Sequence, residues 1–232
     1  MVKNHIKRIK APRTWRILRK EKTFVSKPNP GAHNQSLSIA INTFLKDMTN
    51  ITKTTKETKY LLTKQEVLLN GKRIRDDKHA VGLFDLITIP SLKKHFRIII
   101  DKSNSLYAKE LKSEEKELLI RVNGKTVIGK NKVQINTRSG RNIILSDKDA
   151  KQYSTGDTII IQIPDNKILK HIKREKGVQV LIYTGKHVGK IGTLESIDGT
   201  VATLKTGKQE IQTNKNYIIV LGKDKPEINI EK

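Results

Sequence analysis

Short apolar runs separated by turn residues limit the second half of this chain to small β-structures. In residues 177–192, alternating apolar residues lead into a turn that contains Gly185 and Gly189, and Ile191 opens a second apolar run. Further runs of this kind fill most of the chain from Leu118 onward. Short strands at this spacing, with turn residues between them, predict a small β-barrel or sandwich.

The expected strands follow from these runs. In chain order they cover residues 118–122, 126–128, 133–135, 142–145, 158–163, 178–182, 191–197, 201–204, 209–212 and 217–220. Tight turns are expected at the dipeptides that separate neighbouring runs, Asn123-Gly124, Ser139-Gly140 and Asp198-Gly199. Pro164 should end the run before it, because proline has no N–H for a ladder hydrogen bond. We expect β-rich modules in series, without a clear sequence repeat.

Two helices are predicted at the start of residues 36–90. Apolar residues recur at helical spacing across residues 36–48 and predict an amphipathic helix there. Thr54 and Glu57 have the spacing of a capping box. A second helix should therefore begin at this point and run to about Leu62.

A hairpin and one further strand complete this expected unit. Residues 67–75 contain Asn70-Gly71, a dipeptide that favours a tight hairpin turn. Residues 86–89 predict a strand that Pro90 ends. Residues 93–117 are mixed and charged, and they predict no firm element.

The formal charge narrows the class of partner. The 232 residues include 47 Lys and Arg against 23 Asp and Glu, which gives a formal net charge of +24. Self-repulsion at such a charge destabilises the compact state unless a partner supplies the opposite sign. A pI of 10.1 is typical of nucleic-acid binding. A membrane surface fits less well, because no expected helix has a broad apolar face opposite its lysines.

Composition excludes several other classes. Hydrophobic residues make up 35% of the chain and aromatic residues 4%, which predicts several small cores. There is no cysteine, so disulfides and zinc–thiolate sites are excluded. Apolar runs such as Ile98–Ile100 and Ile159–Ile161 are far too short to span a bilayer. The basic N-terminus lacks the apolar segment of a signal peptide. We expect a cytoplasmic protein without a cofactor or metal.

The first 35 residues form an expected basic arm. Pro12, Pro28 and Pro30 interrupt any long helix, and Glu21 is the one acidic residue. Such an arm can remain a solvated tail or become ordered against RNA, with Trp15 either stacking on a base or anchoring the arm to its own body. Its expected RNA-binding residues are Lys3, Lys7, Arg8, Lys10, Arg13, Trp15, Arg16, Arg19 and Lys20.

Two further basic clusters coincide with expected structural elements. The second helix should start beside Lys53, and the free amides of a helix N-terminus favour phosphate. In the loop of the last module, Gly185 and Gly189 permit positive φ and close backbone approach. Ordinary helix surfaces and hairpin loops also carry such residues. We expect Asp76 and Asp77 to pair locally and restrain the neighbouring arginines. The expected RNA-binding residues are Lys53, Lys56, Lys59, Lys72, Arg73 and Arg75 in the first cluster, and Lys186, His187, Gly189 and Lys190 in the second.

Catalysis has little support in the sequence. The segment from Gly185 departs from a nucleotide-binding P-loop, because Gly189-Lys190 is followed by Ile191 and a strand. There is no Gly-x-Ser-x-Gly motif, and turns explain Asp85 better than acid–base work. Most histidines should lie at the surface or face RNA; they are dispersed at His5, His33, His79, His95, His171 and His187. We expect no catalytic residue, no metal site and no small-molecule substrate.

Two motifs of known RNA-binding modules can be matched to the chain. Residues 67–76 and 81–87 look like an alpha-L RNA-binding motif. Residues 177–198 look like a KOW motif, in which Gly189 would be the hallmark glycine. The KOW motif by itself is weak, because several ribosomal and transcription proteins share it.

The N-terminal segments fit one family that carries both motifs. Residues 5–15 are similar to its opening signature, and residues 27–33 are similar to its Pro-Gly-Pro-His element, with Ala32 in place of the second proline. With all four segments in family order, essentially the whole chain resembles the archaeal and eukaryotic small-subunit ribosomal protein four family of the "e" type. The short segment after the KOW motif resembles archaeal members more than eukaryotic ones.

The resemblance implies an α+β, multi-module fold. An extended basic N-terminal arm (1–35) would precede an alpha-L RNA-binding domain (36–92) built from helices and a small sheet. Two small β-barrel modules would follow, a central β-rich domain (93–174) and a KOW domain with an SH3-like barrel (175–232).

The resemblance also implies a function without catalysis. The chain would be a monomer within the ribosome, in the cytoplasm, where it contacts small-subunit ribosomal RNA and neighbouring small-subunit proteins. The family's RNA contacts would fall on the basic arm, on Lys53, Lys56, Arg73 and Arg75, and on the KOW turn. The alternatives are a KOW-bearing transcription elongation factor, an rRNA-modifying enzyme with an alpha-L module, and a general DNA-compacting protein. An enzyme would need a separate domain with a catalytic aspartate, for which no segment has the length or motif.

Overall fold

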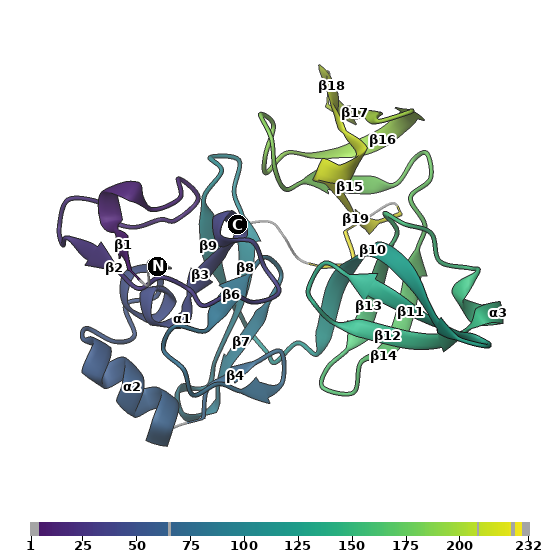
Figure 1. Cartoon of the computed structure of the whole chain (residues 1–232). Helices are drawn as coiled ribbons and strands as arrows, with labels where there is room; N and C mark the ends of the chain where they lie inside the picture. Colours follow the sequence, from purple (N-terminus) through teal and green to yellow (C-terminus); the bar gives the residue numbers. More distant parts are fainter. Residues whose placement is uncertain (1–4, 65, 208, 224–225, 229–232) are drawn as a thin grey trace. The chain divides into compact units, whose positions relative to one another are not determined.

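The computed structural model describes residues 5–64, 66–207, 209–223 and 226–228 (Figure 1). Most of the regular secondary structure in these residues is β-strand, with few helices. The chain divides into two compact units. The first comprises Met1–Ile100 and Asn104–Lys116, and the second comprises Asp101–Ser103 and Glu117–Lys232.

An antiparallel five-stranded sheet organises the first unit, in the order β5-β4-β7-β8-β9. Its strands are β4 (Leu68–Leu69), β5 (Lys72–Arg73), β7 (Leu86–Ile89), β8 (Lys94–Ile100) and β9 (Leu106–Leu111). Between β4 and β5, Asn70 has φ 49° and Gly71 has φ 76°, the pair of positive values that a type I′ turn requires. The predicted hairpin is therefore confirmed, as is the strand that ends before Pro90.

The hairpin of β8 and β9 occupies the segment for which the sequence predicted no element. Residues 96–100 are all buried, and β8 is a central strand that pairs with both β7 and β9. A strand buried on both faces shows no alternation of apolar and polar residues. The domain boundary expected after residue 92 consequently falls inside this sheet.

The helix predicted over residues 36–48 begins later than expected. Residues 38–40 instead form β3 (Ser38–Ala40), which pairs with β6 (Ala80–Gly82). Only then do α1 (Ile41–Thr43) and a π-helical stretch over Phe44–Met48 follow. Tertiary pairing with β6 outweighs the local helical periodicity at the start of this segment. The second helix, α2 (Thr55–Lys64), is close to its predicted range.

The N-terminal segment packs into the first unit. Its two short strands, β1 (Ile6–Lys7) and β2 (Phe24–Val25), pair with each other. Trp15 has only 2% of its surface exposed and forms a parallel bridge with Leu106. The indole N–H of Trp15 donates to the carbonyl of Gln35 (3.3 Å). Of the two roles proposed for Trp15, this position fits anchoring and leaves no free ring face for stacking.

Two antiparallel five-stranded sheets form the second unit. The first, in the order β12-β11-β10-β13-β14, contains β10 (Glu117–Gly129), β11 (Lys132–Thr137), β12 (Asn142–Ser146), β13 (Thr158–Gln162) and β14 (Lys167–Ile172), and a short helix α3 (Asp147–Ala150) follows β12. The second, in the order β18-β17-β16-β15-β19, contains β15 (Gln179–Ile182), β16 (Ile191–Asp198), β17 (Val201–Thr206), β18 (Gln209–Asn214) and β19 (Ile218–Gly222). The strands of the second sheet match the sequence prediction closely.

One long strand replaces a hairpin predicted in the first of these sheets. Asn123-Gly124 was expected to turn the chain, but β10 continues through it with a shift of register. The first half of β10 pairs with β13 and the second half with β11. The dipeptide therefore forms a bulge, where glycine is also favoured. Strand β14 was not predicted.

The two sheets of the second unit share a core. Ile160 and Ile172 of the first sheet belong to one buried cluster with Val180, Leu194 and Val220 of the second. This cluster forms because the apolar faces of both sheets would otherwise be exposed to water. The second unit is thus one packed body in this structure.

Candidate nucleic-acid interface

The basic residues of the N-terminal segment divide into exposed and buried groups. Arg8 is 3% exposed, and its guanidinium forms an ion pair with Asp47 (2.7 Å). Arg19 is half-buried and donates to the carbonyls of Ala11 (2.8 Å) and Pro12 (2.9 Å). These arginines, like Trp15, hold the segment's own fold. The predicted residues left exposed are Lys7, Lys10, Arg13, Arg16 and Lys20; Lys3 lies outside the described residues.

The N-terminus of α2 carries a carboxylate of its own. The backbone N–H of Glu57 donates to Thr54 Oγ1 (3.2 Å), and the N–H groups of Lys53 (2.7 Å) and Thr54 (3.4 Å) donate to Glu57 Oε2. This is the predicted capping box. The hydrogen bond from the Lys53 N–H, followed by that from the Thr54 hydroxyl, holds the pKa of Glu57 below its ordinary value. Because this end of α2 already has a negative charge, the lysine side chains are better candidates for phosphate than the helix terminus.

All the predicted basic residues of α2 and the β4–β5 hairpin are exposed. On α2, the buried face consists of Thr58, Leu61 and Leu62, so Lys56 and Lys59 lie on the solvent side. Most of this charge is uncompensated, although Lys59 approaches Asp77 (3.9 Å) and Arg73 approaches Glu66 (3.7 Å).

Asp76 pairs locally, as expected, but its contacts are with a backbone N–H and an amide and not with the neighbouring arginines. Asp76 accepts from the side chain of Asn29 (2.6 Å) and the N–H of Lys78 (2.9 Å). These bonds close the turn after Arg75, and Arg73 donates instead to the carbonyl of Thr63 (3.0 Å). Asp76 therefore shapes this turn, and the exposed Arg73 and Arg75 are not held by the acidic pair in any ion pair of the described residues.

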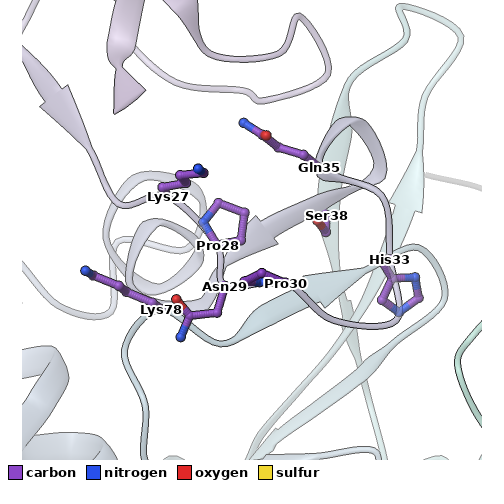
Figure 2. Close-up of a pocket in the computed structure, with 8 residues that line it drawn as sticks. All are labelled: Lys27, Pro28, Asn29, Pro30, His33, Gln35, Ser38 and Lys78. Atoms are coloured by element: carbon purple, nitrogen blue, oxygen red, sulfur yellow. The ribbon is translucent and has the colours of Figure 1, made fainter. Parts of the chain in front are cut away.

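A pocket of about 330 Å³ adjoins these residues in the first unit (Figure 2). In Figure 2, Lys27 and Lys78 lie on one side of it, and His33 on the other. Its remaining lining consists of Pro28, Asn29, Pro30, Gln35 and Ser38. The lining has no carboxylate, and its positive charge comes from lysines, so it suits an anion.

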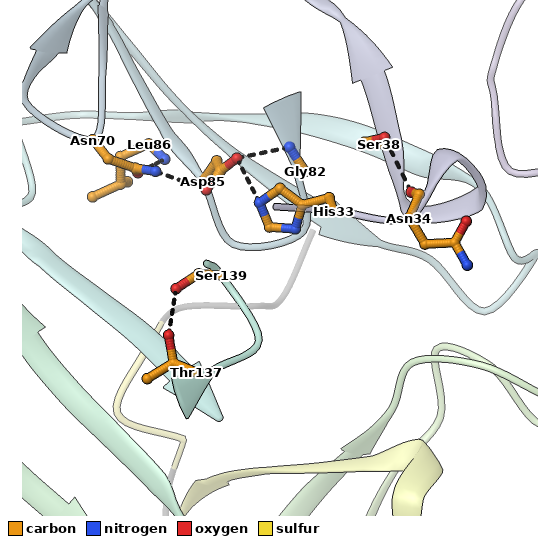
Figure 3. Close-up of polar contacts among 9 residues, drawn as sticks. All are labelled: His33, Asn34, Ser38, Asn70, Gly82, Asp85, Leu86, Thr137 and Ser139. Atoms are coloured by element: carbon orange, nitrogen blue, oxygen red, sulfur yellow. Dashed lines mark hydrogen bonds and ion pairs between the residues drawn. The ribbon is translucent and has the colours of Figure 1, made fainter. Parts of the chain in front are cut away.

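A buried polar network fixes the segment that contains His33 (Figure 3). Asp85 is 2% exposed, lies 3.1 Å from His33 Nε2, and accepts from the Gly82 N–H (2.7 Å) and the Asn70 side chain (2.8 Å). Asn70 in turn accepts from the N–H of Leu86 (2.9 Å). His33 is therefore a structural residue and not a surface one.

The charge state of Asp85 follows from this network. Burial raises the pKa of Asp85, but the charge and hydrogen bond of His33, with the donors of Gly82 and Asn70, outweigh burial and hold the pKa below its ordinary value. The bond from the Gly82 N–H belongs to the local turn that the sequence predicted, whereas the pairing of Asp85 with His33 joins a distant segment.

The loop between β15 and β16 presents one fully exposed cation. Lys186 is exposed, His187 and Lys190 are half-buried, and Gly189 is buried. At Gly189 φ is 76°, and a Cβ would lie 2.2 Å from the Asp101 carbonyl oxygen. The space that glycine leaves at this position is filled by the protein's own backbone. Gly189 consequently shapes the loop, and Lys186 is its most accessible candidate for phosphate.

Tyr60 is an exposed aromatic residue that the sequence analysis missed. Its side chain is 63% exposed on α2, within one helical turn of Lys56 and Lys59. It lines an open, partly apolar groove with Leu61 and Leu92. The signal was available, since an aromatic residue among lysines on the polar face of a helix is typical of base stacking.

Other kinds of site find no counterpart in the described residues. Across residues 5–64, 66–207, 209–223 and 226–228, no cluster of His, Cys, Asp and Glu could hold a metal ion. Within the same ranges, no helix has the length and apolar character needed to cross a membrane.

Comparison with known proteins identifies the family. The description "Ribosomal family S4e" matches residues 92–168, and the RS4NT (NUC023) domain matches residues 2–36. Small ribosomal subunit protein eS4 of Archaeoglobus fulgidus is 34% identical over 239 residues, which cover 99% of both chains. The chain belongs to the ribosomal S4e family.

Further S4e proteins agree over nearly the full length. Small ribosomal subunit protein eS4 of Methanosphaera stadtmanae is 34% identical over 235 residues, covering 98% of this chain and 96% of its own. The crystal structure of the 30S ribosomal protein S4e from Thermoplasma acidophilum superposes with a TM-score of 0.66 at 25% identity, over 80% of this chain and 94% of that chain. The multi-module, mostly β fold is therefore that of an S4e protein, and of archaeal type.

Proposed function

We propose that this chain is a structural constituent of the small ribosomal subunit, where it binds ribosomal RNA and supports assembly and translation. The near full-length match to eS4 proteins carries this proposal. The chain works in the ribosome, in the cytoplasm, and it is not an enzyme. Its other partners are neighbouring small-subunit proteins, and it is a monomer within the subunit.

The RNA-binding surface is assigned to side chains that are exposed and basic. In the first unit these are Lys7, Lys10, Arg13, Arg16, Lys20, Lys53, Lys56, Lys59, Lys72, Arg73 and Arg75, and in the second unit Lys186, with His187 and Lys190 at its side. Lys3, which lies outside the described residues, is assigned to RNA by its place in the basic N-terminal sequence. Each would neutralise a phosphate and release counterions. Arg8, Arg19, Trp15 and Gly189 support the surface by holding the backbone.

The finer architecture is also part of the proposal. Residues 36–92 correspond to an alpha-L module, to whose sheet β8 and β9 add two strands, and residues 175–232 correspond to a KOW module with an SH3-like barrel. In sequence, a basic N-terminal segment (1–35) precedes the alpha-L module, and a central β-rich domain (93–174) separates the two modules. The tight Asn70-Gly71 hairpin supports the alpha-L assignment. The five strands after residue 178, with the glycine-containing loop between the first two, support the KOW assignment.

The test is binding to small-subunit ribosomal RNA at several salt concentrations. Log K should fall linearly with log salt, with a slope of about −0.9 for each phosphate contact in a duplex. Ten contacts would therefore give a slope of about −9. Affinity that stays constant from 50 to about 200 mM salt would contradict the electrostatic mechanism.

Sedimentation of a cell extract tests the assignment to the ribosome. In a gradient that separates the two subunits, the protein should appear in the small-subunit peak and be absent from the large-subunit peak. Co-purification with RNA polymerase would favour the elongation-factor alternative, and uridine isomerisation in a synthetic RNA would favour the modifying enzyme. The eS4 relatives lend no support to either alternative.

A further inference from the structure

Three arginines of the second unit meet at the turn before β19. Arg121 on β10 is 6% exposed, whereas Arg138 and Arg174 are half-buried. They come from three separate segments, the end of the β10–β13 pairing, the turn after β11 and the segment after β14. These three residues are called the arginine cluster below.

The contacts of the arginine cluster converge on two adjacent carbonyls and one phenol. Arg121 Nη1 donates to the Asn216 carbonyl (2.7 Å), and Arg174 Nη1 donates to the Lys215 carbonyl (3.3 Å). Arg138 Nη1 donates to the Tyr183 hydroxyl (2.6 Å), and its guanidinium carbon lies 4.0 Å from the centre of the Tyr183 ring. The Tyr183 hydroxyl itself donates to the Asn216 carbonyl. All of these acceptors are neutral.

The arginine cluster has no carboxylate to balance it. Among the described residues, the ion pairs involve none of the three guanidinium groups. Asp157 is the acidic group that comes nearest in the contacts, but it accepts from the backbone N–H of Arg174 (3.0 Å) and pairs with His171 (2.8 Å). Three positive charges with neutral acceptors repel one another, and the repulsion is stronger in a partly buried place.

The protonation of Arg121 reflects this environment. Burial lowers the pKa of the Arg121 guanidinium, and the like charges of Arg174 and Arg138 lower it further, against an opposing effect of Tyr183. Arg121 Nε is also buried without a hydrogen-bond partner. An anion that arrived here would relieve the like-charge repulsion.

Donors for such an anion remain in the arginine cluster. A guanidinium has five N–H donors, and the contacts above use one donor each on Arg138 and Arg174. Both side chains are half-buried and so reach solvent. Beside them, Asn216 is exposed, and Tyr217 is 40% exposed with its ring 3.1 Å from where a Cβ of Gly185 would lie. Arg138 and Arg174 thus retain donors for a phosphate, and Tyr217 is exposed at the position after Asn216.

We propose that the arginine cluster is a preformed phosphate site, occupied by a backbone phosphate of ribosomal RNA, with Tyr217 available to an adjacent base. The proposal rests on the proposed function and adds to it a site separate from the predicted lysines of the β15–β16 loop. RNA is favoured over an acidic protein segment by the exposed Tyr217, which follows Asn216 in the chain, since base stacking on aromatic side chains accompanies phosphate contacts in single-stranded RNA recognition. The planar guanidinium fork also matches phosphate geometry.

The experiment compares two double variants of the full chain. Arg138→Gln with Arg174→Gln removes two charges from the arginine cluster. Lys151→Gln with Lys205→Gln removes the same charge from exposed residues of the same unit that already have acidic partners, Asp147 (3.4 Å) and Glu195 (3.8 Å). Binding to in vitro transcribed small-subunit ribosomal RNA is measured from 50 mM salt upward, and circular dichroism verifies the fold of each variant.

The expected result is a salt slope that becomes about 1 less steep in the arginine double variant, because one phosphate contact is lost. The lysine control should keep the slope of the wild type. Arg138→Lys with Arg174→Lys should restore most of the slope, because the charges return. If the double variant does not fold, Arg138→Gln alone should weaken RNA binding at 50 mM salt and make the slope less steep, by no more than about 1.

The outcomes separate this inference from the proposed function. Steep salt dependence in the wild type, with equal slopes in the arginine variant and the lysine control, would overturn the phosphate site alone. Wild-type protein without salt-dependent RNA binding would overturn both proposals. A defect that appears with assembled subunits but not with protein-free RNA would also overturn the phosphate site, and would assign the arginine cluster to an acidic segment of a neighbouring protein.

Discussion

Replacing Asp85 by alanine should destabilise the first unit strongly. The carboxylate receives the Gly82 N–H, the Asn70 side chain and His33 Nε2 at 2.7, 2.8 and 3.1 Å. Asp85→Ala leaves all three donors without their acceptor in a place from which water is excluded. Removing one partner of a buried ion pair costs about 3–5 kcal/mol, and we expect a loss in that range. A domain of ordinary stability has only about 5–15 kcal/mol in total.

The chain carries a built-in probe for this measurement. Trp15 is the only tryptophan in the sequence and is buried in the first unit. Urea unfolding followed by tryptophan fluorescence therefore reports the first unit alone, which matters because a chain of two units need not unfold in one step. For Asp85→Ala, the urea midpoint of the fluorescence-detected transition should fall. The transition of the second unit, followed by circular dichroism, should keep its midpoint.

The pH dependence gives a second reading of the same network. The folded pKa of Asp85 lies below its unfolded value. A group with a depressed pKa stabilises the fold above the unfolded pKa, near 3.9 for aspartate, and this contribution is lost as pH falls through the folded pKa. The difference in stability between wild type and Asp85→Ala should thus be full at neutral pH and shrink in acid.

A matched control removes a carboxylate that is exposed. Glu110 lies on β9 of the same unit and is exposed, so Glu110→Ala should change stability by no more than about 0.5 kcal/mol. If the free energy of unfolding of Asp85→Ala were within about 1 kcal/mol of the wild-type value, the network would contribute no more than an exposed ion pair does. The reasoning from burial and unpaired donors would then be refuted.

Three further variants test other features. Gly189→Ala should destabilise the second unit by more than the roughly 1–2 kcal/mol that a left-handed φ costs, because a Cβ would also collide with Asp101. Gly177→Ala is the control, since Gly177 has φ 86° and open space around its Cβ position, so this variant shows the backbone strain alone. Equal losses of stability in urea unfolding would rule out a contribution from the collision. Thr54→Ala should cost about 1 kcal/mol in the fluorescence-detected unfolding of the first unit, and a neutral result would deny the cap. Lys56→Gln should weaken ribosomal RNA binding uniformly and reduce the salt slope by about 1; an unchanged slope would remove Lys56 from the interface.

Local signals predicted those parts of the fold that depend on neighbouring residues. Asn70-Gly71 needs only its own backbone to turn, and Thr54 needs only Glu57 three residues later, so both were evident from the sequence. The strands after residue 178 were also evident, because apolar and polar residues alternate within them and glycine-containing turns separate them. Their positions required no knowledge of what packs against them.

Elements decided by distant partners could not be predicted in this way. β3 exists because Ser38–Ala40 pairs with Ala80–Gly82, some forty positions away in the chain, and β10 runs through Asn123-Gly124 because β11 and β13 both pair with it. The His33–Asp85 pair likewise joins segments whose approach no spacing indicates. The net charge follows from composition alone. Which arginines are buried, such as Arg8, and which are exposed, such as Arg13, is decided only by the fold.

The basic residues fall into two groups that differ in which substitutions they should tolerate. An exposed Lys or Arg that meets a phosphate acts mainly as a positive charge, so exchanging one type for the other should be tolerated there. Arg19 instead spans the Ala11 and Pro12 carbonyls with two nitrogens of one rigid plane, a geometry that a lysine ammonium cannot reproduce. Lysine at position 19 would keep the net charge of +24 yet release the turn that presents Arg13 and Arg16. Lys and Arg should therefore replace each other freely at exposed positions. Arginine should be required at the few positions where its guanidinium donates to two backbone carbonyls.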